Sequence, residues 1–187
     1  MIFTFTDFGA EGPYLGQMVG VLGAMAPNVP VINLLSNAPK FDPWRSSYLL
    51  SALSQHLPPK SIVLAVVDPG VGGDREGICL YADGRFFVGP DNGLLDGVAQ
   101  HALHSEWRVI RWRPERMSST FHGRDLFAPI AARIALGDFD WSTSHWQGPD
   151  LTRRPVDLCE VIYEDVYGNA LTGVTSRSDQ GLMSRPI

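Results

Sequence analysis

The stretch Ser-Ile-Val-Leu-Ala-Val-Val at residues 61–67 decides the fold class, because it is a continuous apolar run of strand length. A strand that is apolar on both faces is typical of the centre of a parallel sheet, where helices cover both sides. The run is followed at once by the acidic, glycine-rich turn Asp-Pro-Gly-Val-Gly-Gly-Asp-Arg at residues 68–75. Open α/β sheets bind ligands at the carboxyl ends of their strands, so this turn is also a candidate site.

Strand-like and helix-like segments alternate on both sides of this run. The expected strands are residues 2–6, 30–35, 76–82, 85–89 and 107–113, and the expected helices are residues 14–26, 43–56, 92–104 and 123–136. Asp42 is a good helix N-cap with Pro43 in the first helical position. Asp83-Gly84 is a strong hairpin turn. The alternation predicts an α/β fold with a mostly parallel layered sheet and helices on both faces. The strand at 30–35 is expected to be buried.

The pattern changes near residue 140. Residues 141–156 are polar and rich in turn-forming residues, which predicts a connecting loop. Residues 157–164 and 170–175 resemble two further strands. We therefore expect a large α/β domain over residues 1–140 and a small β-type domain over residues 157–187, with a frayed end at residues 176–187.

Composition and charge exclude several classes of protein. The 187 residues carry a formal net charge of −5, so the general electrostatic footprint of a nucleic-acid-binding protein is missing. The closest basic group is explained as the solvated face of a strand; it consists of Arg108, Arg111, Arg113 and Arg116. No apolar run approaches the ~20 residues of a membrane span, and the N-terminus has no signal-peptide pattern. We expect a cytoplasmic protein without membrane or nucleic-acid partners.

The two cysteines, Cys79 and Cys159, both have apolar neighbours in the sequence. This setting is typical of buried structural thiols. Neither belongs to a CxxC pair, so the sequence predicts no disulfide framework and no zinc site.

Polar turns stand where an α/β sheet binds ligands. Three of them contain Asp7, Asp68 and Asp91, and a fourth polar segment around His122 opens an expected helix. Each also has a structural explanation, because an Asp after a strand usually makes an Asx-turn or a helix cap. In the same way, Asp125 could cap the helix or pair with its neighbour, and a lone histidine is more often structural than catalytic.

Other familiar site patterns are missing. His101 and His104 lie three residues apart on an expected helix, which favours an exposed face over a metal-binding pair. The glycines of residues 70–73 are not followed by the Gly-Lys-Ser/Thr of a P-loop, and no GxGxxG follows the first strand. The sequence therefore predicts neither a metal site nor a dinucleotide site.

In order and spacing, the polar segments resemble the S-adenosylmethionine hydroxide adenosyltransferase family, which also contains the adenosyl chlorinase and fluorinase. The resemblance extends from residue 4 to about residue 173. The motifs that carry it are T-D-F-G at 6–9, G-P-Y-L-G at 12–16, V-D-P-G-V-G at 67–72 with Arg75, P-D-N-G-L-L at 90–95, T-F-H-G-R-D at 120–125 and D-V-Y-G-N at 165–169.

The resemblance implies the reaction of S-adenosylmethionine with water to give adenosine and methionine, with no metal or other cofactor. It makes Asp68, Arg75 and His122 a catalytic triad that acts on the attacking water. It assigns Asp7 to the ribose hydroxyls and Phe41 to packing against the nucleoside. The further substrate-binding positions that it implies are Asn92, Phe121, Gly123, Asp165 and Asn169.

The resemblance also implies a homotrimer, in which the substrate lies between the large domain of one subunit and the small β-barrel domain of its neighbour. In that comparison residues 157–187 are only the first strands of a truncated C-terminal barrel. Gly12 stands where many members carry an acid beside the methionine amino group, and Gly173 replaces a frequent Asn.

Two alternatives to the hydrolase stay open, the first of them because of the shortened C-terminal region. One is a non-catalytic nucleoside-binding or structural paralogue, and the other is a 5′-halogenase. The halogenating relatives lack the Asp-Arg-His triad that is present here. The halide-contacting serine of the fluorinase aligns with Gly123. Both comparisons favour hydrolysis over halogenation.

Overall fold

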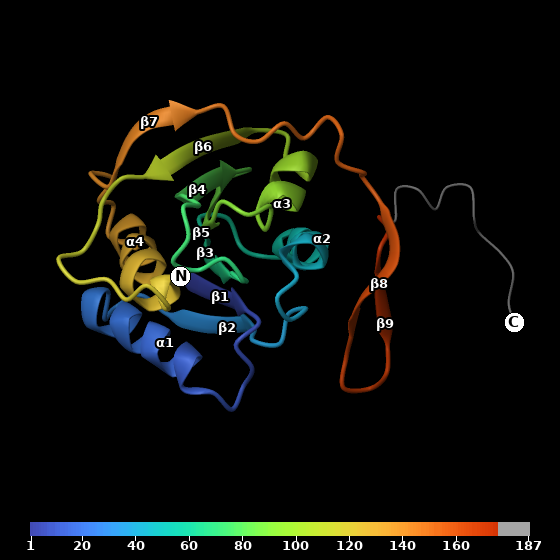
Figure 1. Cartoon of the computed structure of the whole chain (residues 1–187), viewed down its shortest axis with the longest axis horizontal. Coiled ribbons are helices and arrows are strands. Elements are labelled where there is room, and N and C mark those ends of the chain that lie inside the picture. Colours follow the sequence, from blue (N-terminus) through green and yellow to red (C-terminus); the bar gives the residue numbers. More distant parts are fainter. Residues whose placement is uncertain (176–187) are drawn as a thin grey trace, which may run out of the picture.

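A computed structural model of the protein describes residues 1–175, and residues 143–145 by their backbone alone. The expected fraying of residues 176–187 lies outside the described residues. Residues 1–175 form a layered α/β fold with a small two-stranded sheet beside it (Figure 1). No helix in this range is both long and apolar enough to cross a membrane.

The helices and strands follow one another in the alternating order that the sequence predicts. In chain order they are β1 (Ile2–Thr6), α1 (Pro13–Met25), β2 (Val31–Leu35), α2 (Pro43–Ser54), β3 (Ile62–Val66), β4 (Gly77–Ala82), β5 (Arg85–Pro90), α3 (Asp96–His101), β6 (Ser105–Ile110), η1 (Gly123–Phe127), α4 (Ala128–Ala135), β7 (Ser142–Trp146), β8 (Leu158–Glu164) and β9 (Ala170–Gly173).

Within the described residues, the large sheet has seven strands in the order β2-β1-β3-β5-β4-β6-β7. β1 pairs in parallel with β2 and β3, and β3 pairs in parallel with β5. β4 lies antiparallel between β5 and β6, and β7 is antiparallel to β6. All strands except β4 and β7 therefore run in one direction, which confirms the predicted mostly parallel sheet.

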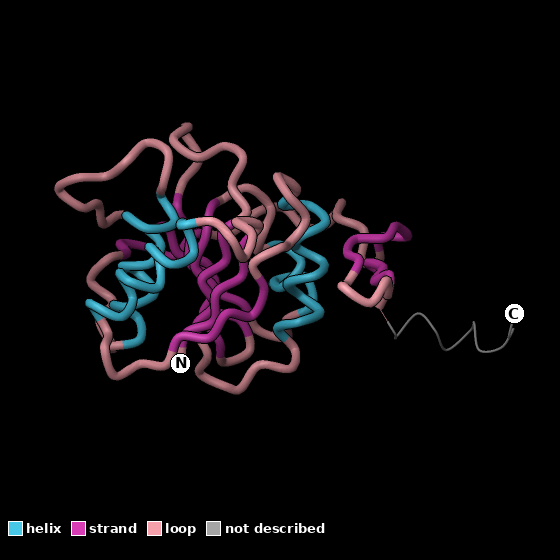
Figure 2. Tube along the Cα trace, turned by 90° about the horizontal axis from the view of Figure 1, so that it is seen from below, coloured by secondary structure: helices cyan, strands magenta, loops and turns pink. Residues whose placement is uncertain are grey.

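β3 is the centre of the core because successive side chains of a strand point to opposite faces. Ile62, Leu64 and Val66 share one buried cluster with residues of α1 and α4. Val63 and Ala65 share the other buried cluster with residues of α2 and α3. Figure 2 shows the helices on both sides of the strands. The apolar run at residues 61–67 thus packs on both faces, as predicted.

Two predictions about the edges of the sheet were wrong. β2 is partly exposed rather than buried, because it is an edge strand whose single neighbour in the sheet is β1. β7 lies inside residues 141–156, which were expected to be a loop, and pairs antiparallel with β6. Its sequence, Ser-Thr-Ser-His-Trp, lacks apolar alternation, so the strand is defined by its ladder with β6 rather than by a sequence pattern.

The expected helix over residues 123–136 has two parts. It begins as the π-helix η1 and continues as α4. Pro129 has no N–H group to donate to the carbonyl four residues earlier. The N–H of Ala128 donates instead to the carbonyl of Gly123, five residues earlier. The wide turn therefore occurs next to the proline and at the edge of the candidate site, where π-turns are frequent.

Other elements differ from expectation in length or exposure. α3 covers only part of residues 92–104, and β6 begins and ends earlier than the expected 107–113. Cys79 is buried as predicted, whereas Cys159 is exposed. Cys159 belongs to the small hairpin, which covers less of its side chains than the large sheet does.

The small sheet consists of the antiparallel pair β8 and β9, as predicted, and it packs beside α2 (Figure 1). The hydroxyl of Tyr48 on α2 donates to the carbonyl of Pro155 (2.8 Å). Arg45 at the start of α2 donates to the carboxylate of Glu160 (2.6 Å). These contacts join the segment before β8, and β8 itself, to one helix of the large domain.

Arg154 anchors this segment. The residue is 8% exposed, and its guanidinium carbon lies 4.3 Å from the ring centre of Trp44 and 4.5 Å from that of Tyr48. Its Nη2 group donates to the hydroxyl of Ser47. Within residues 1–175 its Nε and Nη1 groups have no hydrogen-bond partner. Aromatic contact and packing therefore hold Arg154 in place more than its hydrogen bonds do.

We predict that Arg154→Ala lowers the free energy of unfolding by about 2 kcal/mol, because it removes both ring contacts and leaves a cavity. Arg154→Met is the matched variant. It keeps an unbranched side chain between the rings and removes the buried N–H groups, so its loss should be under about 1 kcal/mol. Urea denaturation of both variants measures this difference. Equal losses in the two variants would contradict the packing role.

Candidate active site

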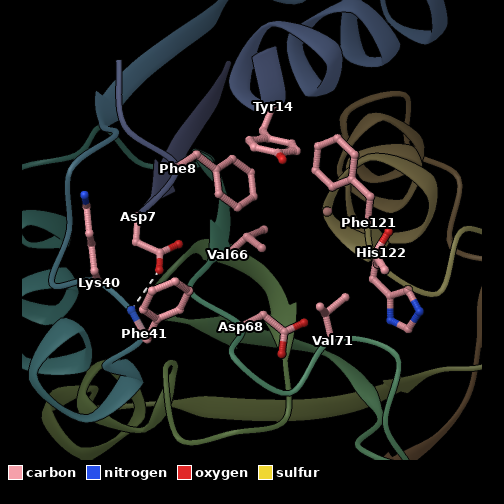
Figure 3. A pocket seen from close by; sticks show the side chains of 12 residues that line it. Asp7, Phe8, Tyr14, Lys40, Phe41, Val66, Asp68, Val71, Phe121 and His122 are labelled. Atoms are coloured by element: carbon pink, nitrogen blue, oxygen red, sulfur yellow. Dashed lines mark hydrogen bonds between the residues drawn. The ribbon is translucent and has the colours of Figure 1, made fainter. Parts of the chain in front are cut away.

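The acidic turns predicted from the sequence meet at one edge of the large sheet. Asp7 follows β1 and Asp68 follows β3, and these strands are parallel neighbours. His122 directly precedes η1. All three side chains line a cavity of about 410 Å³, a usual size for a small-molecule site (Figure 3). The residues that line it are Asp7, Phe8, Tyr14, Lys40, Phe41, Val66, Asp68, Val71, Thr120, Phe121, His122 and Gly123.

Asp68, Arg75 and His122 form one connected group. Arg75 Nε donates to Asp68 Oδ1 (2.9 Å), and Arg75 Nη2 donates to Asp68 Oδ2. The same Nη2 group lies 3.0 Å from Nδ1 of His122. The Asp68 and Arg75 side chains are only 4% and 11% exposed. A guanidinium that holds both oxygens of a buried carboxylate fixes the direction of that carboxylate as well as its charge.

The contact with Arg75 also determines the tautomer of His122. A guanidinium can only donate, so Nδ1 must be the acceptor and the neutral ring carries its proton on Nε2. Burial of the ring, together with the positive charge of Arg75, lowers the pKa of His122 below its ordinary value. His122 is therefore a neutral imidazole at neutral pH.

A glycine lets the two loops of this group touch. Gly72 has a φ of +82°, and a Cβ at this position would collide with the carbonyl oxygen of Ser119. Glycine satisfies both conditions because it has no Cβ and accepts a positive φ. Residues 118–120 lead directly into His122, so this close approach brings the Arg75 loop to the imidazole.

Asp125 holds the same loop from the other side, and it makes the structural contacts that the sequence allowed. Its Oδ2 accepts a hydrogen bond from the backbone N–H of Ser118 (2.8 Å), and its Oδ1 accepts one from Arg124 Nε (2.5 Å). These contacts lower the pKa of Asp125, with the Arg124 hydrogen bond as the main cause. Asp125 therefore shapes the loop before His122.

Asp7 and Phe41 form the side of the cavity opposite His122 (Figure 3). The backbone N–H of Phe41 donates to Asp7 Oδ2 (2.9 Å). Phe41 has a φ of 57°, a region that bulky residues rarely adopt, and the residue is 75% exposed. Burial raises the pKa of Asp7, against the opposing effect of this hydrogen bond. Asp7 thus holds an exposed aromatic ring at the mouth of the cavity.

Three aromatic rings form a further wall. Phe8, Tyr14 and Phe121 all line the cavity and contact one another pairwise. Phe121 was predicted, whereas Phe8 and Tyr14 were given no role. Their place in the motifs at residues 6–9 and 12–16 was the available signal. The cavity is also lined by four residues for which the sequence predicted no role, namely Lys40, Val66, Val71 and Thr120.

Gly123 lines the cavity, whereas Asn92 is not among the residues that line it. The Nδ2 group of Asn92 donates to the carbonyl of Val67 (2.9 Å), and its Oδ1 accepts a hydrogen bond from the N–H of Leu94 (3.2 Å). The Nδ2 end of the amide thus holds the turn after β5 against the end of β3, and the Oδ1 end fixes the turn itself. In this structure Asn92 supports the Asp68 strand.

Asp165 and Asn169 also lie apart from the cavity of their own chain. Both belong to the turn between β8 and β9, where Asn169 Nδ2 donates to Asp165 Oδ2 (2.8 Å). The backbone N–H groups of Tyr167 and Asn169 donate to Asp165 Oδ1. The two side chains therefore define the shape of an exposed turn beside the large sheet.

His101 lies outside the cavity, next to a hydroxyl and a backbone carbonyl. His101 Nδ1 lies 2.8 Å from the carbonyl of Gly97 and 3.3 Å from the hydroxyl of Ser51. His101 is partly buried against α2, so the prediction that it lies on an exposed face was wrong. Among the side chains that the structure describes, no three of His, Cys, Asp or Glu are grouped so that they could hold a metal ion.

Comparison with known proteins identifies the family. The sequence profile of the SAM hydroxide adenosyltransferase N-terminal domain matches residues 2–143. A Thermus thermophilus protein named (R)-S-adenosyl-L-methionine hydrolase is 38% identical over 194 residues, which cover 91% of this chain and 73% of that protein. A Salinispora arenicola protein of the same name is 42% identical over 137 residues, 71% of this chain and 52% of that protein.

A solved structure supports the same conclusion. An uncharacterized conserved protein from Thermotoga maritima superimposes with a TM-score of 0.84 at 31% sequence identity, covering 92% of this chain and 71% of that one. The profile match spans the strands β1 to β6 of the large sheet and all the residues that line the cavity. The chain therefore belongs to the SAM hydroxide adenosyltransferase family.

Proposed function

We propose that the protein hydrolyses S-adenosyl-L-methionine to adenosine and L-methionine, by in-line attack of water on the ribose 5′ carbon. The observation that carries this proposal is the connected group of Asp68, Arg75 and His122 at a cavity that also contains Asp7 and Phe41. Relatives at 38% and 42% identity are named for this hydrolysis. The proposed reaction uses the substrate and water, and it needs no cofactor.

The chemistry places its demand on the nucleophile. When the bond between the 5′ carbon and sulfur breaks, the electron pair goes to sulfur and the cation becomes a neutral thioether. This leaving group needs no proton. The enzyme must therefore hold a water in line with the breaking bond and accept its proton.

The connected group can meet both requirements. Two N–H groups of Arg75 donate to the two oxygens of the Asp68 carboxylate. Each oxygen has a second lone pair, which can accept a hydrogen bond from a water. Neutral His122 carries a proton on Nε2, which can donate to the oxygen of the same water. We propose that Asp68 accepts the proton as the carbon–oxygen bond forms. Arg75 and His122 then act to hold Asp68 and the water in position.

The opposite wall suits the nucleoside. We propose that Asp7 accepts hydrogen bonds from the ribose hydroxyls while its Oδ2 holds Phe41, and that the exposed Phe41 ring packs on the adenosyl group. Phe121 and Gly123 complete the pocket around the sugar. For Asn92 we propose only an indirect role, because its amide bonds to the backbone at the end of β3.

Asp165 and Asn169 lie apart from the cavity of their own chain, so we propose that they contact the substrate of a neighbouring subunit. We propose a homotrimer in which the β8–β9 turn of one subunit closes the cavity of its neighbour. In this proposal residues 1–140 are the catalytic domain, to which β7 adds an edge strand, and residues 157–187 belong to the small domain. We place the enzyme in the cytoplasm, since its proposed substrate is a soluble metabolite.

The first prediction concerns the reaction itself. The purified protein should convert S-adenosylmethionine to adenosine and methionine, and water labelled with oxygen-18 should place its label on the 5′ oxygen. Asp68→Asn should lower the rate by about 10²–10⁴-fold, because it removes the proton acceptor.

Asp74→Asn is the matched control, since Asp74 is exposed on the same loop. It should leave the rate unchanged. A folded protein without turnover that binds adenosine would point to a nucleoside-binding paralogue. Incorporation of halide at the 5′ carbon would point to a halogenase.

The second prediction follows from the lowered pKa of His122. Because the folded protein disfavours the charged ring, His122 should titrate below pH 6.5 in an NMR experiment, and kcat/KM should fall as that proton binds. Between this value and the ordinary pKa of 6.5, the unfolded chain binds a proton that the folded protein does not. Stability should therefore decrease as the pH falls through this window. His122→Gln should lack this component, and a pKa above 6.5 would overturn the assignment.

The third prediction tests the trimer. Asp68→Asn and Asn169→Ala subunits should each be nearly inactive alone. In trimers assembled from equal amounts of both, about one quarter of the sites combine an intact large domain with an intact neighbouring turn. Activity should recover to about that fraction of the wild type. If the mixture stays as inactive as its components, Asn169 does not act across the interface.

A further inference from the structure

An aromatic wall stands at one side of the cavity, made of Phe8, Tyr14 and Phe121. The ring centres of Tyr14 and Phe121 are 5.4 Å apart with the planes at 88°, and Phe8 lies 5.8 Å from each of the other two. Such tilted and edge-to-face contacts are favourable and hold the rings in fixed directions. Tyr14 is 51% exposed, so its ring is buried by its neighbours on one side and open on another.

The aromatic wall lies across the cavity from Asp68, which belongs to the connected group (Figure 3). In Figure 3, Asp68 and His122 lie at the lower and right side of the cavity, and Phe8 and Tyr14 lie across from Asp68 at the top. In an in-line displacement, the attacking oxygen and the leaving atom stand on opposite sides of the carbon. A water held by Asp68 therefore directs the leaving sulfur toward Phe8 and Tyr14.

We infer that this aromatic wall recognises the positive charge of the substrate's sulfonium group, an inference that rests on the proposed hydrolase function. The faces of aromatic rings are negative, and they attract cations, from the ammonium of lysine to the quaternary ammonium ions that aromatic cages bind. A sulfonium is such a cation. The wall would thus distinguish a sulfonium from a neutral thioether of nearly the same shape.

One ring of the wall already holds a cation. The guanidinium carbon of Arg124 lies 5.1 Å from the ring centre of Phe121. This contact occupies one face of Phe121, and Arg124 is itself paired with Asp125. Tyr14 and Phe8 are consequently the rings that remain for the substrate, and Tyr14 is the more exposed of the two.

Gly123 lies directly against two rings of the aromatic wall. A Cβ at this position would lie 3.0 Å from Met18 Sδ, 3.3 Å from Phe121 Cε2 and 3.5 Å from Phe8 Cζ. A side chain here would have to displace atoms of the wall. The glycine therefore lets Phe8 and Phe121 pack closely.

The inferred contact has a defined place in the reaction. The positive charge exists in the bound substrate and disappears when the carbon–sulfur bond breaks, because the electron pair stays on sulfur. An interaction with that charge is therefore stronger in the ground state than after cleavage. It should contribute to substrate binding and to release of the thioether product, and it should not raise kcat.

The test compares two inhibitors that share the adenosine and amino-acid ends. S-adenosylhomocysteine has a neutral thioether, and sinefungin has an ammonium-bearing carbon in place of the sulfonium. The wild type should bind sinefungin more tightly. In Tyr14→Leu the ratio of the two inhibition constants should fall about 3- to 20-fold toward unity. Tyr14→Phe keeps the ring and should keep the ratio.

The outcomes separate this inference from the function on which it rests. If the wild type hydrolyses S-adenosylmethionine and Tyr14→Leu leaves the ratio unchanged, the aromatic recognition is wrong and the hydrolase stands. If Tyr14→Leu lowers kcat with an unchanged KM, Tyr14 acts on the chemical step instead, which also overturns the inference. If the wild type turns over no substrate, the proposed function itself fails.

Discussion

The buried ion pair between Asp68 and Arg75 is the interaction on which the rest of the site depends. Both side chains are almost entirely removed from water, and burial of two charges costs several kcal/mol per ion before they attract each other. The fork geometry of two N–H groups on one carboxylate offsets this cost, and the ring of Phe127 lies 5.2 Å from the guanidinium carbon. Removal of either partner would leave a buried charge without its counter-ion.

The pair also joins parts of the chain that are distant in sequence. Asp68 stands at the end of the central strand, Arg75 at the start of the next hairpin, and His122 before the π-turn. Because β3 is buried on both faces, the backbone position from which Asp68 follows is fixed. The missing Cβ of Gly72 then sets how closely the loop before His122 can approach. The position of the imidazole is therefore a consequence of backbone geometry at three places.

The sequence was sufficient for features that depend on local chemistry. The apolar run at 61–67 predicted a strand buried on both faces, and Asp42 caps α2 by accepting from the N–H of Arg45 as its position suggested. The order of the polar turns predicted that Asp7 and Asp68 share one edge of the sheet, because the ends of neighbouring parallel strands lie together. The segment around His122 was expected at the start of a helix, which is where it lies.

Features that depend on tertiary contacts could not be predicted in this way. β7 is a polar segment held by its partner strand, and β2 is exposed because of its place in the strand order. Asn92 was expected to bind the substrate, yet its amide makes hydrogen bonds with the backbone of Val67 and Leu94. The aromatic wall combines Phe8, Tyr14 and Phe121, which lie in three separate segments of the chain. No pattern within one of these segments predicts that the three rings meet.

The charges of the cavity suit a cationic substrate. Asp68 and Arg75 cancel each other, and the neighbouring guanidinium helps to keep His122 neutral, so this side of the cavity carries almost no net charge. Asp7 then contributes a negative charge, and Lys40 stands beside it at the exposed mouth. Asp7 is partly buried whereas Lys40 is exposed, so we expect the carboxylate to act more strongly on a bound sulfonium than the ammonium does. The products lack this cation, so the charge that attracts the substrate does not hold the adenosine. Burial raises the pKa of Asp7 and lowers the pKa of His122. As the pH falls, protonation of Asp7 therefore weakens the proposed contact with the ribose, and protonation of His122 changes the proposed contact with the attacking water.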